Sequence, residues 1–277
     1  MSARVLALGL ALLAAHGRLQ GRAPEPVQWC GSSVPRLASA EAQLAHARRR
    51  KGQLGAHSGD ALVRWRADTV AAYRAVRLYH PGDVAIGAEA AFRAGELLRA
   101  GEDDAGALAE FRWTAAAAPE TAFGPRARLE IGHIERRRGN FGEALAAYLD
   151  VAAEARAPAA RREDAWCWAG VVLKAQGRSD DARAAWERVR ERGTDALSRI
   201  RAYDELGTLA LESEDLEGAA GLLDECLVRL AERALEESEQ GERVRAALSS
   251  MHVVAELPRA IARRKDSSAA RGTTRKS

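Results

Sequence analysis

Small residues recur along this chain with a period of about 37 residues, and this period constrains the fold more than any other feature. Four glycines mark it: Gly95, Gly132, Gly170 and Gly207 stand 37, 38 and 37 residues apart. Repeats of this length predict supersecondary units that cannot bury their apolar faces alone. Such units are expected to stack on one another along the chain.

Each glycine is followed twelve residues later by an alanine, and four residues after that by a large apolar residue. The alanines are Ala107, Ala144, Ala182 and Ala219, and the large residues are Phe111, Tyr148, Trp186 and Leu223. A glycine inside a helix costs about 1 kcal/mol relative to alanine, so its recurrence needs a packing reason. We expect each glycine to face the alanine of a second, antiparallel helix, with the large residue filling the gap toward the next pair.

A turn separates each glycine from its alanine. Three of the four turns hold a glycine suited to the left-handed residue that ends a helix, namely Gly101, Gly139 and Gly177. Candidate N-caps for the following helix are Asn140, Asp180 and Asp215. The composition agrees with helices, because the apolar residues make up 47% of the chain and are mostly Ala and Leu, while aromatics make up 5%.

The pattern resembles the tetratricopeptide repeat (TPR), whose signature runs W-x2-L-G-x2-Y, then A-x3-F, then P. The third repeat carries the likeness best, with Trp166, Gly170, Leu173, Ala182 and Trp186. The second repeat departs from the signature at Arg128 and Glu135, where large apolar residues are expected. The resemblance implies an all-α fold: an α-solenoid of stacked antiparallel helix pairs, forming a right-handed superhelix.

The repeats divide the chain into five segments. We predict a signal peptide at 1–17, a flexible segment at 18–36, a TPR array at 37–229, a capping helix region at 230–257 and a basic disordered tail at 258–277. Within the array we expect a degenerate repeat at 37–81 and further repeats at about 88–119, 125–158, 163–194 and 200–229. The closing helix is expected to stop at Pro258.

The N-terminal segment predicts export. Arg4 precedes an apolar run from Val5 to Ala15, and small residues follow at Ala15 and Gly17. Such a run is too short to cross a bilayer as a helix and is typical of a secretory signal peptide. The alternative is an N-terminal helix packed on the core, which would make the protein cytoplasmic.

Residues that carry enzyme chemistry are scarce, and we predict no catalytic residue, no cofactor and no metal site. The motifs HExxH, GxSxG and GxxxxGK[ST] are absent, and the six histidines lack the spacing of metal ligands. The cysteines Cys30, Cys167 and Cys226 form no metal or redox motif, and the latter two are expected to be buried in helices. Outside the tail the charges alternate in sign, so no nucleic-acid partner is expected.

In TPR arrays the first helix of each repeat lines a concave groove, which the resemblance implies is the usual peptide-binding surface. The groove positions of this chain predict a basic strip made of Arg126, His133, Arg136, Arg137, Lys174 and Arg201. Guanidinium groups bind carboxylates with two hydrogen bonds, so the strip is expected to receive an acidic or extended segment of a protein partner. The alternative is a solvated face on which these charges gather by chance.

The function expected from these observations is a non-catalytic adaptor that binds partner segments. The period of about 37 residues is longer than the 34 residues of the TPR repeat. An exported chain with TPR units of this longer period resembles the periplasmic TPR adaptors of bacteria, which implies a place in the cell envelope. Two alternatives are a self-associating structural scaffold and a cytoplasmic TPR interaction protein. The basic tail has seven basic residues and one acidic residue from Arg259 to Ser277. A weak contact of this tail with a membrane surface is a further hypothesis.

Overall fold

The computed structural model describes residues 34–273, and their side chains as far as Arg264. The predicted signal peptide, most of the predicted flexible segment and Cys30 lie outside this range. Within it the chain is helical, with short connections and no strand. The described residues belong to two compact units, which divide between Ala127 and Arg128.

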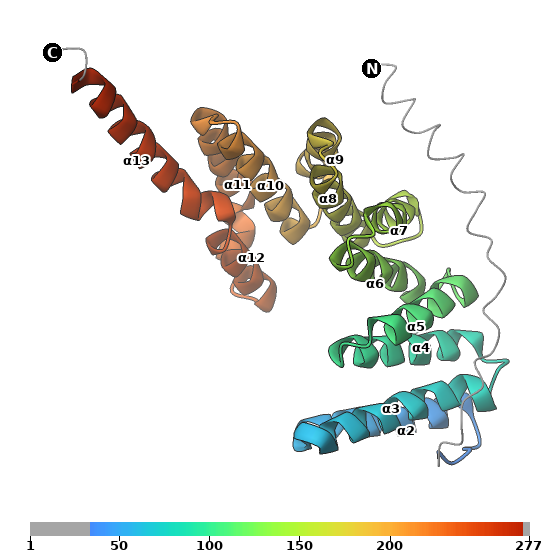
Figure 1. The fold of residues 1–277 in the computed structure, drawn as a ribbon. Coiled ribbons are helices and arrows are strands. Elements are labelled where there is room, and N and C mark those ends of the chain that lie inside the picture. Colours follow the sequence, from blue (N-terminus) through green and yellow to red (C-terminus); the bar gives the residue numbers. More distant parts are fainter. Residues whose placement is uncertain (1–33, 274–277) are drawn as a thin grey trace. The chain divides into compact units, whose positions relative to one another are not determined.

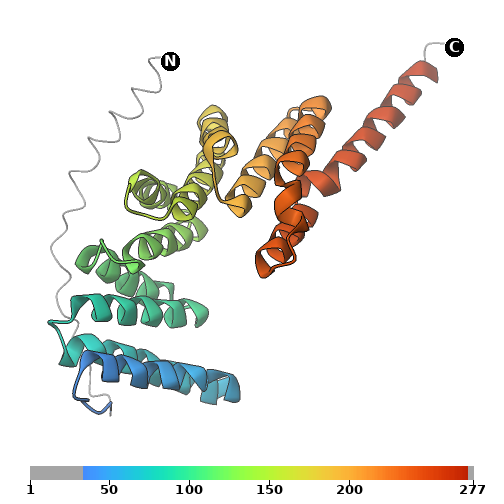
Figure 2. The same ribbon diagram turned by 180° about the vertical axis from the view of Figure 1, so that it is seen from behind.

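Unit 1 consists of two antiparallel helix pairs and the start of a third. Its helices are α2 (Ala40–Gly52), the short 3-10 helix η2 (Leu54–Ala56), α3 (Gly59–Tyr79), α4 (Val84–Ala100), α5 (Asp104–Ala117) and the first turn of α6 (Phe123–Arg137). Helix α2 packs on α3, α3 on α4 and α4 on α5 (Figures 1 and 2). The core of this unit is made of alanine with a few large residues, among them Tyr73 and Phe111, whose side chains are buried.

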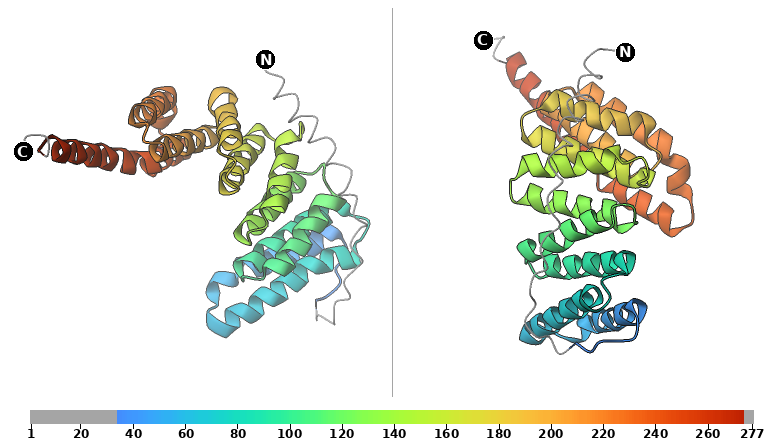
Figure 3. Two further views of the ribbon diagram at one scale, coloured as in Figure 1. Left: turned by 45° about the horizontal axis from the view of Figure 1, so that its top comes forward. Right: turned by 90° about the vertical axis from the view of Figure 1, so that its right-hand side faces the viewer.

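Unit 2 is also built of helix pairs. It holds the rest of α6, then α7 (Phe141–Ala153), α8 (Ala159–Ala175), α9 (Ser179–Arg192), α10 (Ala196–Glu212), α11 (Leu216–Leu235), α12 (Glu239–Ser249) and α13 (His252–Thr273). Neighbours in sequence from α7 to α12 pack on each other, and α8 also packs on α10 (Figure 3). Helix pairs that follow one another in this way confirm the TPR-like, all-α helical repeat that the sequence predicted.

The recurrent glycines make room for a ring rather than for an alanine, which corrects the sequence prediction. A methyl group added at Gly95 would lie 2.6 Å from Phe111, and one at Gly132 would lie 2.6 Å from Tyr148. At Gly170 the same addition would collide with the indole of Trp186. Each ring therefore packs on the glycine of its own pair instead of filling a gap toward the next pair.

The last glycine of the series has a different partner. A methyl group at Gly207 would lie 2.9 Å from Val253, which comes from α13, and Leu223 is not among its nearest neighbours. Val253 is fully buried, and Met251 and Leu257 are buried beside it in the same core. Because a leucine replaces the ring in this repeat, the C-terminal helix supplies the residue that closes the pair.

All four turns contain a residue in the left-handed conformation at the second position after the helix, although only two of the turns use glycine there. Gly139 and Gly177 adopt the predicted left-handed conformation, with φ of 78° and 76°. The prediction for Gly101 was wrong, because its φ is −99° and the left-handed residue is Glu102, with φ of 63°. In the fourth turn Glu214 takes this role, with φ of 59°. The position relative to the helix end, not the residue type, sets the conformation.

Replacing these two glutamates by glycine should stabilise the protein. A residue with a Cβ pays roughly 1 kcal/mol in the left-handed region, where glycine pays nothing. We expect Glu102→Gly and Glu214→Gly each to raise the free energy of unfolding by up to about 1 kcal/mol, and the two gains to add because they lie in different units. Urea unfolding followed by circular dichroism measures this. Glu217→Gly, within the first turn of α11, should destabilise instead.

N-caps agree with the sequence prediction in part. The carboxylate of Asp215 accepts a hydrogen bond from the Gly218 backbone N–H (2.9 Å), as a cap should. Asn140 occupies the N-cap position of α7, but its side chain donates to Glu135 Oε2 (2.8 Å) instead of capping. The prediction for Asp180 was wrong, because α9 begins at Ser179 and Asp180 lies inside its first turn.

Helix α13 runs through Pro258 to Thr273, so the predicted stop at Pro258 and the disordered tail from 258 onward are not observed. The apolar spacing explains the difference. Val253 and Leu257 are buried one turn apart, and this pattern continues across the proline to the half-buried Ala260. A proline inside a helix removes a single backbone hydrogen bond, which the packing of the preceding turns offsets here.

Cys167 and Cys226 are buried free thiols, as the sequence predicted. Burial raises the pKa of Cys226 to about 12, and burial also raises the pKa of Cys167 above its usual range. Both side chains act as small apolar groups in helix packing. No described helix combines the length and the apolar character needed to cross a membrane.

Candidate protein-binding surface

The first helix of each pair carries the side chains that the sequence assigned to a binding groove. These first helices are α2 and α4 in unit 1, α8 and α10 in unit 2, and α6, which runs from one unit into the other. Their surface is called the first-helix face below, and it is described for each unit separately. In both units this face combines ion pairs between neighbouring helices with cations stacked on aromatic rings.

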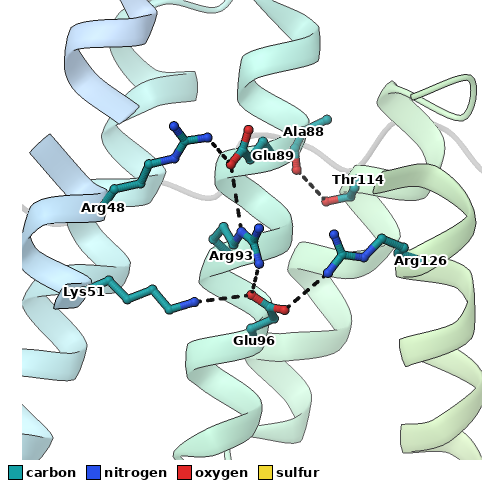
Figure 4. A network of polar contacts seen from close by, with 8 residues as sticks. All are labelled: Arg48, Lys51, Ala88, Glu89, Arg93, Glu96, Thr114 and Arg126. Carbon is teal, nitrogen blue, oxygen red and sulfur yellow. Dashed lines mark hydrogen bonds and ion pairs between the residues drawn. The ribbon is translucent and has the colours of Figure 1, made fainter. Parts of the chain in front are cut away.

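In unit 1 two carboxylates of α4 hold the neighbouring helices together (Figure 4). Glu89 pairs with Arg48 of α2 and lies 3.9 Å from Arg93 Nε. Glu96 pairs with Arg93 (2.9 Å) and accepts two further contacts, from Lys51 Nζ (3.5 Å) and from Arg126 Nη2 (3.7 Å). The acids of α4 therefore neutralise cations on both sides of it.

Arg126 belongs to this network and not to an open basic strip. Besides its contact with Glu96, its guanidinium lies 4.4 Å from the centre of the Phe92 ring and 5.4 Å from that of Phe123. Such stacking contributes about 0.5–1 kcal/mol at exposed sites and fixes the orientation of the cation. Arg126 thus has both an acidic partner and an aromatic support within unit 1.

In unit 2 three residues of the predicted strip gather around Trp168 of α8. The guanidinium of Arg136 from α6 lies 4.8 Å from the centre of the indole, and that of Arg201 from α10 lies 4.6 Å from it. The His133 ring meets the indole edge to face, with centres 5.0 Å apart. We call these four half-buried residues, Trp168, Arg136, Arg201 and His133, the Trp168 cluster.

His133 is held by the aromatic core beneath the cluster. Its Nδ1 lies 2.8 Å from the hydroxyl of Tyr148, whose ring packs on Gly132. Burial raises the pKa of Tyr148, while the positive charge of Arg136 opposes this shift. The histidine therefore links the buried ring of the repeat to Trp168 at the surface, and its orientation is fixed by both.

Some cations of the predicted strip have a carboxylate partner, and Arg136 does not. Arg201 Nη1 pairs with Asp164 (2.5 Å), and Lys174 Nζ pairs with Glu212 (2.6 Å). Arg136 has no ion-pair partner among the residues that the structure describes, and its Nε makes no hydrogen bond to them. Arg137 is exposed. Lys174 lies six residues beyond Trp168 along α8 and is not part of the Trp168 cluster. The strip thus resolves into one cation without a carboxylate, Arg136, beside others that are paired.

Sequence reasoning missed Trp168, the centre of the cluster. The basic strip predicted from the sequence takes Lys174 from α8 and passes over Trp168 of the same helix. A signal existed: the segment WCW at 166–168 contains a second tryptophan outside the TPR signature. A large aromatic residue at an unassigned, half-exposed position is typical of a recognition surface.

The buried acidic side chains in the part of the chain that the structure describes take part in helix packing. No group of three or more His, Cys, Asp or Glu side chains in residues 34–264 is arranged to hold a metal ion. The buried carboxylates Glu110 and Glu135 both have polar partners, which are arginines for Glu110 and Asn140 for Glu135. These groups serve the packing of helices.

Comparison with known proteins yields structural likenesses alone. No protein-family model matches the chain, and no curated protein matches its sequence. Among solved structures, MamA aligns with a TM-score of 0.49 at 18% identity, covering 62% of this chain and 92% of MamA. BtubC (BKLC) from P. vanneervenii aligns with a TM-score of 0.49 at 17% identity, covering 85% of this chain and 93% of BtubC. The fold assignment rests on the helix pairs described above.

Proposed function

We propose that this protein is a non-catalytic scaffold that binds an acidic, extended segment of a partner protein at the Trp168 cluster of unit 2. The observation that carries the proposal is Arg136, a guanidinium supported by an indole and without a carboxylate partner among the described residues. A ligand carboxylate there would form the charge-assisted pair that the chain itself does not supply. Arginine and tryptophan are also the residues most enriched at the energetic centres of protein interfaces.

The neighbours of Arg136 support this role. Arg201, stacked on the same indole, has 39% of its side chain exposed and shares its charge with Asp164. His133 and Trp168 offer an apolar, rigid surface against which the backbone of an extended segment can pack. Arg136 lacks a carboxylate partner, whereas the charge of Arg201 is already partly neutralised by Asp164. The site therefore favours a segment with few acidic residues over a continuous acidic run.

Arg136→Glu should weaken binding of a short acidic peptide by about tenfold or more, because a central contact contributes about 1–3 kcal/mol and the substitution adds repulsion. Fluorescence anisotropy of a labelled acidic peptide, with its lysine-substituted counterpart as a second probe, measures the dissociation constant. Arg183→Glu makes the same charge change at an exposed position of α9 and should alter affinity by less than about twofold. Equal losses for the two variants would reject the Trp168 cluster as the binding site.

We also propose that the protein is exported to the bacterial cell envelope, as the apolar run from Val5 to Ala15 suggests. These residues lie outside the described range, so the proposal rests on the sequence. Deleting residues 2–17 should leave the protein in the cytoplasm, whereas the intact chain should appear in the envelope fraction and lose its N-terminal segment. Identical fractionation of the two forms would favour a cytoplasmic interaction protein.

A further inference from the structure

Helix α13 is attached to unit 2 by its first turns alone. The backbone N–H of Val253 donates to Asp204 Oδ1 of α10 (2.9 Å), so a carboxylate from another helix caps the start of α13. Val253 packs on Gly207, and Leu257 is buried one turn later. Beyond Leu257 the helix continues for four more turns, and Figure 1 shows it extending past α11 without a neighbouring helix of unit 2 beside it.

One face of α13 is apolar and exposed. Val254 and Ile261 have 37% and 38% of their surface exposed and are seven residues apart, and exposed Pro258 lies between them. Residues at i, i+4 and i+7 lie on one side of a helix. This side differs from the one that holds Val253 and Leu257, so the helix has a second apolar stripe that the described residues cover only in part.

Basic side chains lie on other sides of α13, with Arg259 and Arg263 roughly opposite this second stripe. Arg259, Arg263 and Arg264 are exposed, and Glu256 is the single acidic residue between His252 and Arg264. Arg259 and Arg263 both contact Glu256, at 67% and 68% side-chain exposure. The sequence adds Lys265, Asp266, Arg271, Arg275 and Lys276, so that residues 252–277 carry seven basic and two acidic residues, a net charge of +5. The rest of the chain is −2, because the whole is +3.

We propose that α13 is a surface-binding helix that lies on an anionic lipid membrane, with Val254, Pro258 and Ile261 inserted among the headgroups. A helix with an apolar stripe on one side and basic residues on its polar side is the form that binds in the plane of an anionic interface. Each basic residue near such a surface strengthens binding by about fivefold, and the apolar stripe adds to this. Three apolar side chains cover too little area for a stable protein interface, which buries roughly 800 Å² per partner. A lipid surface needs no such area.

The test uses the full-length protein and sedimentation with vesicles of phosphatidylglycerol mixed with phosphatidylcholine, or of phosphatidylcholine alone. We expect binding to the anionic vesicles only, weakening as salt increases. Arg259→Glu with Arg263→Glu should weaken it by at least about 25-fold, since two contributions of about fivefold are lost. Arg178→Glu with Arg183→Glu makes the same charge change on two exposed residues, one at the N-cap of α9 and one within α9, and should weaken binding far less.

A further variant separates a lipid from another polyanion. Ile261→Asp should weaken binding to the anionic vesicles beyond the effect of Ala262→Asp, an exposed neighbour off the apolar stripe, while both should bind heparin alike. Any one of three results would overturn the proposal: equal binding to both vesicle types, equal losses in the α13 and α9 charge variants, or equal effects of Ile261→Asp and Ala262→Asp.

Circular dichroism must show that each variant has the helical content of the parent protein. If the charge variant of α13 fails this check, Arg259→Gln with Arg263→Gln replaces it. If Ile261→Asp fails, Ile261→Ser replaces it.

Discussion

Trp186→Ala is expected to lower the free energy of unfolding of unit 2 by about 3–5 kcal/mol, which is the cost of truncating a large buried aromatic side chain. Trp186 is the largest fully buried side chain of the described residues, and its Nε1 donates a hydrogen bond to the Cys167 carbonyl (3.1 Å). The variant loses the ring and its hydrogen bond to Cys167, and it leaves a cavity over Gly170. Urea unfolding gives the energy, and hydrogen exchange should place the loss in α8 to α10.

Trp168→Ala is the matched control, because it removes an indole from the same helix pair at a half-buried position. Its effect on stability should be less than half that of Trp186→Ala, while its effect on peptide binding should be larger. Equal destabilisation by both variants would contradict the distinction between a packing ring at 186 and a surface ring at 168.

The contact between Gly170 and Trp186 allows a stricter test by a double-mutant cycle. Gly170→Ala should destabilise the protein by about 1–3 kcal/mol, because the added methyl group forces the buried indole to move. In a Trp186→Leu background the same change should cost much less or stabilise, because alanine favours the helix by about 1 kcal/mol. Gly221→Ala is the control, since nothing lies near that position in α11, and it should stabilise in both backgrounds.

The period of the sequence was enough to predict helix pairs, because a glycine and a large residue at fixed spacing determine how two helices approach. It did not identify the partner of each glycine. Alanine and the ring four residues later lie on one helix face, and only the coordinates show that the ring reaches Gly170 first. The left-handed Glu102 and Glu214 were missed for a related reason, since glycine is preferred at that position but not required there.

The charged residues of the candidate site could be assigned from the sequence, but its central Trp168 and its charge balance could not. Periodicity along one helix indicates which side chains share a face, so His133, Arg136 and Arg201 were correctly assigned to first helices. Whether a cation is paired depends on the register between helices, which the sequence of one helix does not contain. The pairing of Lys174 with Glu212 and of Arg201 with Asp164 therefore appeared only in the structure.

Glu110→Ala is expected to cost unit 1 about 3–5 kcal/mol, as large as the loss of a buried aromatic ring, because it removes the acidic partner of two mostly buried guanidinium groups. The carboxylate is 3% exposed and accepts from Arg74 Nε (2.6 Å) and Arg77 Nη2 (2.5 Å). Burial lowers the pKa of Arg77, and the charge of Glu110 opposes that shift. Without the carboxylate, the cost of keeping Arg77 charged in the interior is no longer offset.

The measurement is urea unfolding with hydrogen exchange, which should place the loss in α3 to α5 and leave α8 to α10 protected. Asp68→Ala removes the acidic partner of Arg50 in an exposed pair of the same unit and should change stability by less than about 1 kcal/mol. A second variant, Arg74→Met and Arg77→Met with Glu110→Met, replaces the buried charges by apolar side chains and should recover much of the loss. If this triple variant is as unstable as Glu110→Ala, the cost comes from lost packing and not from an uncompensated buried charge.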